Sequence, residues 1–212
     1  MRYLSGVITQ TLLANPRDDL GLMLQPGMGT FDSKRLELST RVWGADNGRY
    51  AAADRWDAGD WLEWAASMRR WRATCLFMVA PDVVGDAQAT LELSRPYLPT
   101  IRQFGFPAAF VAQNGFDSRL VNPDSFDVLF VGGREPWKFA EDGGYAAARW
   151  ARSHGKKTHM GRVNSWRRLR ACQVSLFDSS DGTYVKHGPD ELIRDIYYWL
   201  DQANGQRFME IA

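Results

Sequence analysis

Acidic and amide side chains follow several apolar segments of this sequence. Asp46 comes after VWGA, Asp82 after CLFMVAP, Gln113 after AFVA, and Asp178 directly after VSLF. Two carboxylates in one pocket can carry out a glycosyl transfer, in which one attacks the anomeric carbon and the other handles the proton of the leaving or entering group. Asp178 is therefore the candidate nucleophile and Asp46 the candidate general acid and base.

Each of these residues also has an ordinary structural explanation. Asp, Ser and Gly are turn formers, so the stretch LFDSSDGT at 176–183 is also compatible with a simple turn. Three acids could instead bind a metal ion, and magnesium would then be expected, because His159 is the only histidine near them. The sequence has no GxSxG, P-loop or dinucleotide-binding GxGxxG motif.

The elements that must position these residues alternate along the chain. Short apolar runs predict strands at 3–9, 21–25, 42–45, 75–81, 108–113, 127–132, 157–162 and 174–178. Amphipathic patterns predict helices at 57–72, 86–103, 137–153, 165–172 and 189–203. Pro96 and Pro99 are expected to kink or end the second of these helices.

This alternation predicts an α/β fold in which parallel strands are joined by right-handed crossovers. Eight strands suggest a compact (β/α)8 barrel formed by residues 1–212 as one domain, with an open doubly wound sheet as the alternative. The segments 10–20 and 26–41 resemble loops. Active sites of such barrels lie at the carboxyl ends of the strands, so the polar residues above are expected to converge there.

The composition limits the partners and the compartment. The net charge is +1, so any nucleic-acid contact must depend on a local basic patch. Cys75 and Cys172 are the only cysteines, which is typical of a reduced cytoplasmic protein without disulfides. No run is apolar enough for a membrane span, and the N-terminus lacks the core of a signal peptide.

Six segments, one for each strand from the third to the eighth, match a family pattern in order. They are Asp46-Asn47-Gly48-Arg49-Tyr50, Ala80-Pro81-Asp82, Val111-Ala112-Gln113, Phe130-Val131-Gly132-Gly133, His159-Met160-Gly161 and Leu176-Phe177-Asp178. With these segments the chain resembles the tRNA-guanine transglycosylases. It is more similar to the phage members that exchange guanine in DNA for a 7-deazaguanine base.

The resemblance implies a role for each matched residue. Asp178 would form the covalent bond to the sugar, and Asp46 would move the proton. The base would be bound by Tyr50, Asp82, Gln113, Gly132, Gly133 and Met160. No cofactor is implied, and the family's zinc site of three cysteines and a histidine is missing, which favours DNA over tRNA as the partner of the free 7-deazaguanine.

Basic residues after the sixth and seventh predicted strands are candidates for phosphate binding, and for Arg167 and Arg168 a solvated helix face is an equally good explanation. They are Arg134, Lys138, Arg162, Arg167 and Arg168. Three other functions stay open: a tRNA-guanine transglycosylase, a non-catalytic partner subunit of one, and a hydrolytic N-glycosylase. All catalytic readings require residues 46 and 178 to face one cavity.

Overall fold

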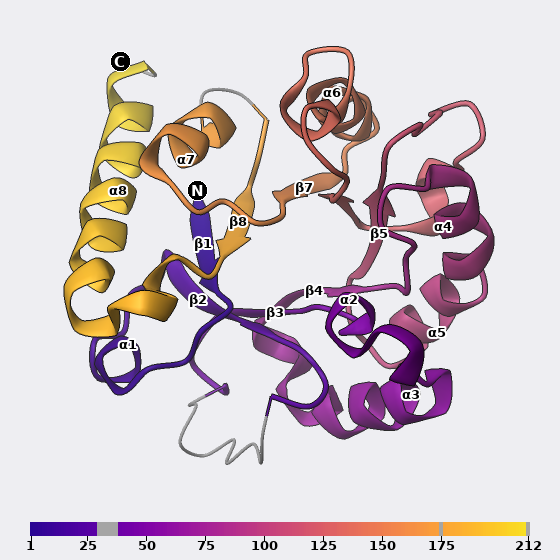
Figure 1. The fold of residues 1–212 in the computed structure, drawn as a ribbon, viewed down its shortest axis with the longest axis horizontal. Helices are drawn as coiled ribbons and strands as arrows, with labels where there is room; N and C mark the ends of the chain where they lie inside the picture. The colour runs from indigo at the N-terminus through magenta and orange to yellow at the C-terminus, as the bar shows by residue number, and fades with distance from the viewer. Residues whose placement is uncertain (29–37, 174–175, 211–212) are drawn as a thin grey trace.

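The strands close into a single parallel barrel. The computed structural model describes residues 1–28, 38–173 and 176–210. Each strand pairs with the next in sequence, and the eighth pairs with the first (Figure 1). The strands are β1 (Arg2–Ser5), β2 (Leu20–Leu24), β3 (Trp43–Ala45), β4 (Cys75–Val79), β5 (Ala108–Ala112), β6 (Val128–Val131), β7 (Lys157–Met160) and β8 (Ser179–Gly182). The predicted (β/α)8 barrel is thereby confirmed.

Helices surround the strands, as Figure 1 shows. They are α1 (Gln10–Ala14), α2 (Arg49–Ala52), α3 (Ala58–Ser67), α4 (Ala87–Ser94), α5 (Tyr97–Gln103), α6 (Gly144–Ser153), α7 (Trp166–Gln173) and α8 (Pro189–Glu210). The segment 86–103 is divided into α4 and α5 at Pro96, as its prolines predicted. Helix α1 lies in a segment expected to be loop, where the Thr9 side chain accepts a hydrogen bond from Leu12 N at 3.1 Å.

Alternate side chains of the strands fill the inside of the barrel. Gly44 has no side chain, and this makes room for Leu4 and Phe77. A Cβ added at Gly44 would lie 2.8 Å from Leu4 Cδ1 and 2.9 Å from Phe77 Cζ. The apolar cluster in the interior consists of Leu4, Met23, Phe77, Val79, Ala109, Val111 and Val128. The other face of each strand packs against the helices. The polar residues that follow the strands therefore lie above an apolar interior.

The last strand differs from the prediction. Of the expected strand 174–178, residues 174–175 lie outside the described residues, and β8 begins only at Ser179. Its four residues pair in register with β1, from Arg2 opposite Ser179 to Ser5 opposite Gly182. Closure of the barrel imposes an extended backbone on the polar sequence SSDG, which local preferences assign to a turn.

Asp178 consequently lies at the amino end of β8, on the opposite end of the barrel from the predicted site. Its Oδ2 accepts a hydrogen bond from Thr158 N at 2.9 Å and lies 3.2 Å from Arg152 Nη1. Its Oδ1 lies 3.4 Å from Lys157 Nζ, at the start of β7. The expectation that Asp178 faces a cavity shared with Asp46 is therefore wrong, because that residue precedes the strand instead of ending it.

The backbone of Asp178 links the neighbouring strands. Its carbonyl accepts from Arg2 N at 3.0 Å, and its N–H donates to Thr158 O at 3.0 Å. These contacts, with those of the side chain, connect β1, β7 and the entry to β8. Asp178 thus joins β1 and β7 by hydrogen bonds at the amino-terminal end of the barrel.

Among the described residues, no helix is both long and apolar enough to cross a membrane.

Replacing Asp178 by Ala is expected to lower the free energy of unfolding by about 1–3 kcal/mol, because the buried N–H of Thr158 loses its acceptor. The matched control is Asp178→Asn, which keeps an oxygen in the same place and should cost less than half as much. Urea denaturation measures both. Equal losses in the two variants would contradict the hydrogen bond as the cause.

Candidate functional site

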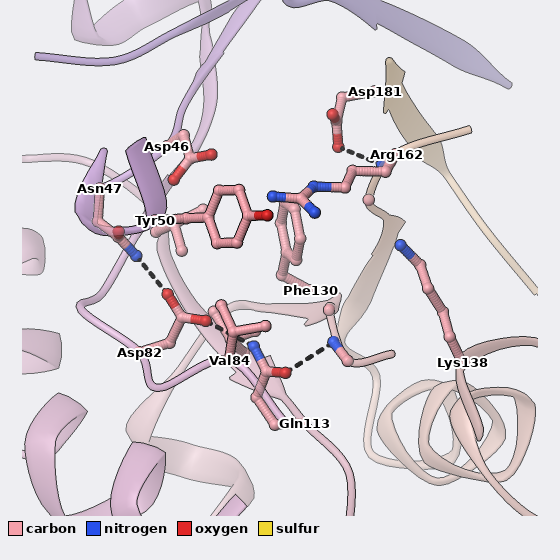
Figure 2. A pocket seen from close by; sticks show the side chains of 15 residues that line it. Asp46, Asn47, Tyr50, Asp82, Val84, Gln113, Phe130, Lys138, Arg162 and Asp181 are labelled. Carbon is pink, nitrogen blue, oxygen red and sulfur yellow. Dashed lines mark hydrogen bonds between the residues drawn. The ribbon is translucent and has the colours of Figure 1, made fainter. Parts of the chain in front are cut away.

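A pocket opens at the carboxyl ends of the strands, as the fold predicts. Figure 2 shows its side chains converging from separate strands and from α2. The lining residues are Asp46, Asn47, Tyr50, Val79, Asp82, Val84, Val111, Gln113, Phe130, Gly132, Gly133, Lys138, Gly161, Arg162 and Asp181. Eight of the thirteen residues chosen from the sequence are in this set; Arg134, Met160, Arg167, Arg168 and Asp178 are not.

Asp46 follows β3 and turns its carboxylate into the pocket (Figure 2). Its backbone N–H bonds to Leu24 O at 2.7 Å, and its Oδ1 accepts from Gly48 N at 3.2 Å. That turn needs a glycine, since Gly48 has a φ of 72°. Burial raises the pKa of Asp46 to about 6, with smaller contributions from the charges of Asp82 and Asp181, while the Gly48 N–H opposes the shift.

Asp181, which was not chosen as a site residue from the sequence, supplies a further carboxylate to the pocket. It lies in β8, and its Oδ1 accepts from His159 Nε2 at 3.0 Å and from Arg162 N at 3.2 Å. Within the described residues, no hydrogen bond is formed by its Oδ2. Asp181, and not Asp178, is thus the β8 carboxylate that shares a cavity with Asp46.

There is a physical reason why the sequence did not identify Asp181 as a site residue. In a strand, side chains point alternately to opposite faces, so Ser179 and Asp181 face inward together. That alternation gives a signal only once Ser179–Gly182 is known to pair with β1 and β7. Read alone, Asp181 is one more turn former in a polar stretch.

A network of amide and carboxylate groups forms another wall of the pocket. Asp82 Oδ1 accepts from Asn47 Nδ2 at 2.8 Å, and Asp82 Oδ2 accepts from Gln113 Nε2 at 2.5 Å. Burial raises the pKa of Asp82, while these two hydrogen bonds oppose the rise. Asn47 was not among the residues chosen from the sequence, yet its side-chain amide holds the Asp82 carboxylate in place by a hydrogen bond.

Gln113 is held on both sides of its amide. Its Oε1 accepts from Gly133 N at 2.7 Å and from Gly85 N at 2.9 Å. The N–H of Gly132 bonds to Ala112 O at 3.0 Å. A Cβ at Gly132 would lie 2.8 Å from Gln113 Nε2, so the lack of a side chain there makes room for the amide. These glycines line the pocket as predicted, but their N–H groups already bond within the protein.

The aromatic walls differ in part from the prediction. Tyr50 lines the pocket and is 64% exposed. Met160 is fully buried in the cluster between barrel and helices, because its side chain points to the outer face of β7. The expectation that Met160 covers a bound base is therefore wrong. Phe130, from β6, provides an aromatic ring in the pocket instead (Figure 2).

A basic groove adjoins the pocket. It is lined by Tyr50, Val84, Gly133, Arg134, Glu135, Lys138, Arg162, Asn164 and Arg168. Tyr50 and Arg162 lie between groove and pocket, with the guanidinium 4.1 Å from the centre of the tyrosine ring. Four of the five predicted phosphate-binding residues line this groove. Arg167, on the same helix as Arg168, is exposed and lies outside it.

Lys138 lies at the junction of pocket and groove. Its side chain is 4% exposed, and Figure 2 shows the ammonium group pointing into the pocket. Burial lowers the pKa of Lys138 to about 8, and the charge of Asp181 opposes this shift. The group remains mostly protonated at pH 7, so the pocket contains a cation beside its carboxylates.

In the part of the chain that the structure describes, no group of three or more His, Cys, Asp or Glu residues is arranged to hold a metal ion.

No family model matches the chain. No curated protein matches it. A similar solved structure is described as a glycerophosphoryl diester phosphodiesterase from Silicibacter pomeroyi DSS-3; it is 16% identical, with a TM-score of 0.38, over 78% of this chain and 48% of that chain. The chain thus spans about half the length of that protein, and a likeness this weak bears on neither activity nor site.

Replacing Asp46 by Asn is expected to stabilise the protein as the pH rises. The folded-state pKa of about 6 exceeds the unfolded value of about 3.9, so the wild type loses stability as the pH rises from about 4 through 6. The gain in the variant should be small at pH 4 and about 3 kcal/mol above pH 7. Urea denaturation across this pH range measures it.

The matched control is Asp57→Asn, because Asp57 also accepts a backbone hydrogen bond, from Asp60 N at 3.0 Å, but lies at the surface. A gain of equal size and pH dependence in this control would contradict burial as the cause.

Proposed function

We propose that this protein is a guanine transglycosylase that exchanges guanine in DNA for a free 7-deazaguanine base. The pair expected from the sequence, Asp46 with Asp178, does not share a cavity, so the proposal no longer rests on that pair. The observation that carries it is that Asp46 and Asp181 line one pocket and differ in their hydrogen bonds and in their pKa. Asp181 has an oxygen without a hydrogen bond among the described residues, which suits a nucleophile. Asp46 has a pKa of about 6, which suits a group that gives up and takes back a proton.

The proposed reaction has two displacement steps. In the first, Asp181 Oδ2 bonds to C1′ of the target guanosine, the C1′–N9 bond breaks, and its electron pair leaves with the base. The protonated carboxyl of Asp46 donates its proton to the departing guanine. In the second, the incoming base gives its N9 proton to Asp46, N9 bonds to C1′, and the C1′–Oδ2 bond breaks. Two inversions give net retention at C1′.

The amide network supports the recognition of a purine edge. Each carboxylate oxygen has about two lone-pair positions, so Asp82 can accept two further hydrogen bonds after those from Asn47 and Gln113. Adjacent N–H donors, such as N1–H and the 2-amino group of guanine, fit this arrangement. Gln113 already uses both ends of its amide, so we assign it the task of fixing Asp82.

The basic groove supports a nucleic-acid substrate. Arg134, Arg162 and Arg168 line a surface that opens beside the pocket, where phosphates on either side of the target nucleotide would lie. The reacting C1′ lies inside the stack of a duplex, so the target nucleotide must be flipped out or single-stranded. The choice of DNA over tRNA follows from the resemblance, which is closer to the phage members that act on DNA.

A covalent adduct between protein and guanine-containing DNA is expected on denaturing gels, and Asp181→Asn should abolish it. Asp178→Asn is the matched control: it removes a carboxylate three residues away, at the other end of the barrel, and should leave the adduct intact. Labelled 7-deazaguanine should enter the DNA, as mass spectrometry of the released nucleosides can measure.

Each alternative has its own outcome in this experiment. Loss of guanine without incorporation would replace the transferase by a hydrolytic N-glycosylase. Incorporation into tRNA but not DNA would change the substrate. An absent adduct, or one that depends on Asp178, would contradict the proposal, and the absent adduct would favour a non-catalytic subunit.

Replacing Arg168 by Gln is expected to weaken binding to single-stranded DNA and to reduce the slope of log K against log salt concentration by about 1, because one phosphate contact is lost. Arg167→Gln is the matched control, since it removes the same charge from the same helix outside the groove. Fluorescence anisotropy at several salt concentrations measures both. Equal losses in the two variants would contradict a specific role of the groove.

A further inference from the structure

His159 is a polar side chain inside the barrel, where its neighbours are mostly apolar. It lies in β7 and is fully buried. Its ring centre lies 4.6 Å from that of Phe77 and 4.6 Å from that of Phe130. A buried imidazole costs free energy unless both nitrogens find partners, so the contacts of these nitrogens indicate why it is there.

Both ring nitrogens have partners, and both partners lie in β8. His159 Nδ1 lies 2.8 Å from Ser179 Oγ, and Nε2 lies 3.0 Å from Asp181 Oδ1. Burial lowers the pKa of His159, so the ring is neutral at pH 7. A carboxylate can only accept, so the proton must reside on Nε2, and Nδ1 then accepts from the Ser179 hydroxyl.

This arrangement holds one oxygen of Asp181 and leaves the other available. Oδ1 accepts from His159 below and from the backbone N–H of Arg162 at 3.2 Å. With these two donors in place, rotation of the carboxylate about its Cβ–Cγ bond would break both hydrogen bonds. The oxygen Oδ2 has no hydrogen-bond donor among the described residues and so remains available to react.

We infer that His159 is a positioning residue, which with Ser179 fixes the Asp181 carboxylate so that Oδ2 is aimed at C1′ of the bound nucleotide. The inference rests on the proposed function, because it assigns Asp181 the role of nucleophile. His159 itself touches no substrate and transfers no proton. The Asp181 carboxylate, which can only accept, selects the tautomer with the proton on Nε2, and the Ser179 hydroxyl donates to Nδ1.

The kinetic experiment compares two variants of similar size. His159→Gln can keep a side-chain N–H near the position of Nε2, whereas His159→Leu removes it. For His159→Leu we expect kcat to fall about 10- to 100-fold with KM within about twofold, since a hydrogen bond to a charged group is lost while base and phosphate contacts remain. His159→Gln should recover most of the loss.

If His159 only stabilised the fold, the kinetic constants of its two variants would change in a different way. Equal kcat values in the two variants, or a change confined to KM, would overturn the positioning role. Thermal unfolding of both variants checks that each is folded, and the ratio between them remains informative if both are less stable. Ser179→Ala should give a smaller loss than His159→Leu, because it removes the partner of Nδ1 but keeps the Nε2–H donor to Asp181.

A second measurement needs no substrate. Ring nitrogen NMR of the full chain, with the His159 signals assigned by their absence in His159→Gln, should show the Nε2–H tautomer in the wild type. The Nε2–H signal should shift in Asp181→Ala. A Nδ1–H tautomer in an active enzyme would overturn the role of His159 alone. A wild type that exchanges no base would overturn the proposed function and, with it, this role.

Discussion

The pairing of β8 with β1 and β7 is the constraint on which the site depends. Backbone N–H and C=O groups in the barrel must be hydrogen-bonded, and a closed barrel has no free edge. Residues Ser179–Gly182 are therefore extended in register with Arg2–Ser5, although their side chains favour a turn. A shift of this register by one residue would turn Asp181 to the outer face of the barrel. The identity of the pocket's second carboxylate is thus a consequence of strand register.

The acids of the pocket differ because their hydrogen-bond donors differ. Asp82 accepts from two side-chain amides, and Asp181 accepts from a ring nitrogen and a backbone N–H. Asp46 accepts a hydrogen bond only from Gly48 N among the described residues, and its pKa rises to about 6. Carboxylates whose environments separate their pKa values are suited to separate tasks. The division of labour proposed for Asp46 and Asp181 therefore follows from what surrounds each of them.

The sequence predicted best those residues that directly follow clearly apolar strands. Asp46, Asp82, Gln113, Gly132 and Gly133 all line the pocket, because strands β3 to β6 were recognisable from their apolar side chains and were placed within a few residues. Helices α3 to α8 were recognisable for the same reason, whereas the short helices α1 and α2 were not predicted. Burial of an apolar face imposes a period on the sequence, and that period can be read without a structure.

The failures arose where a prediction required knowing which face of a strand a residue occupies. Met160 and His159 are adjacent in β7, and only the pairing with β6 and β8 makes His159 the inward one. Asp178 and Asp181 are three residues apart, and barrel closure separates them to opposite ends of β8. The sequence by itself determined the order of strands and helices, since apolar burial acts locally along the chain. Only the tertiary structure decided which acid enters the pocket, because register couples residues 2–5 to residues 179–182 through hydrogen bonds that no local pattern encodes.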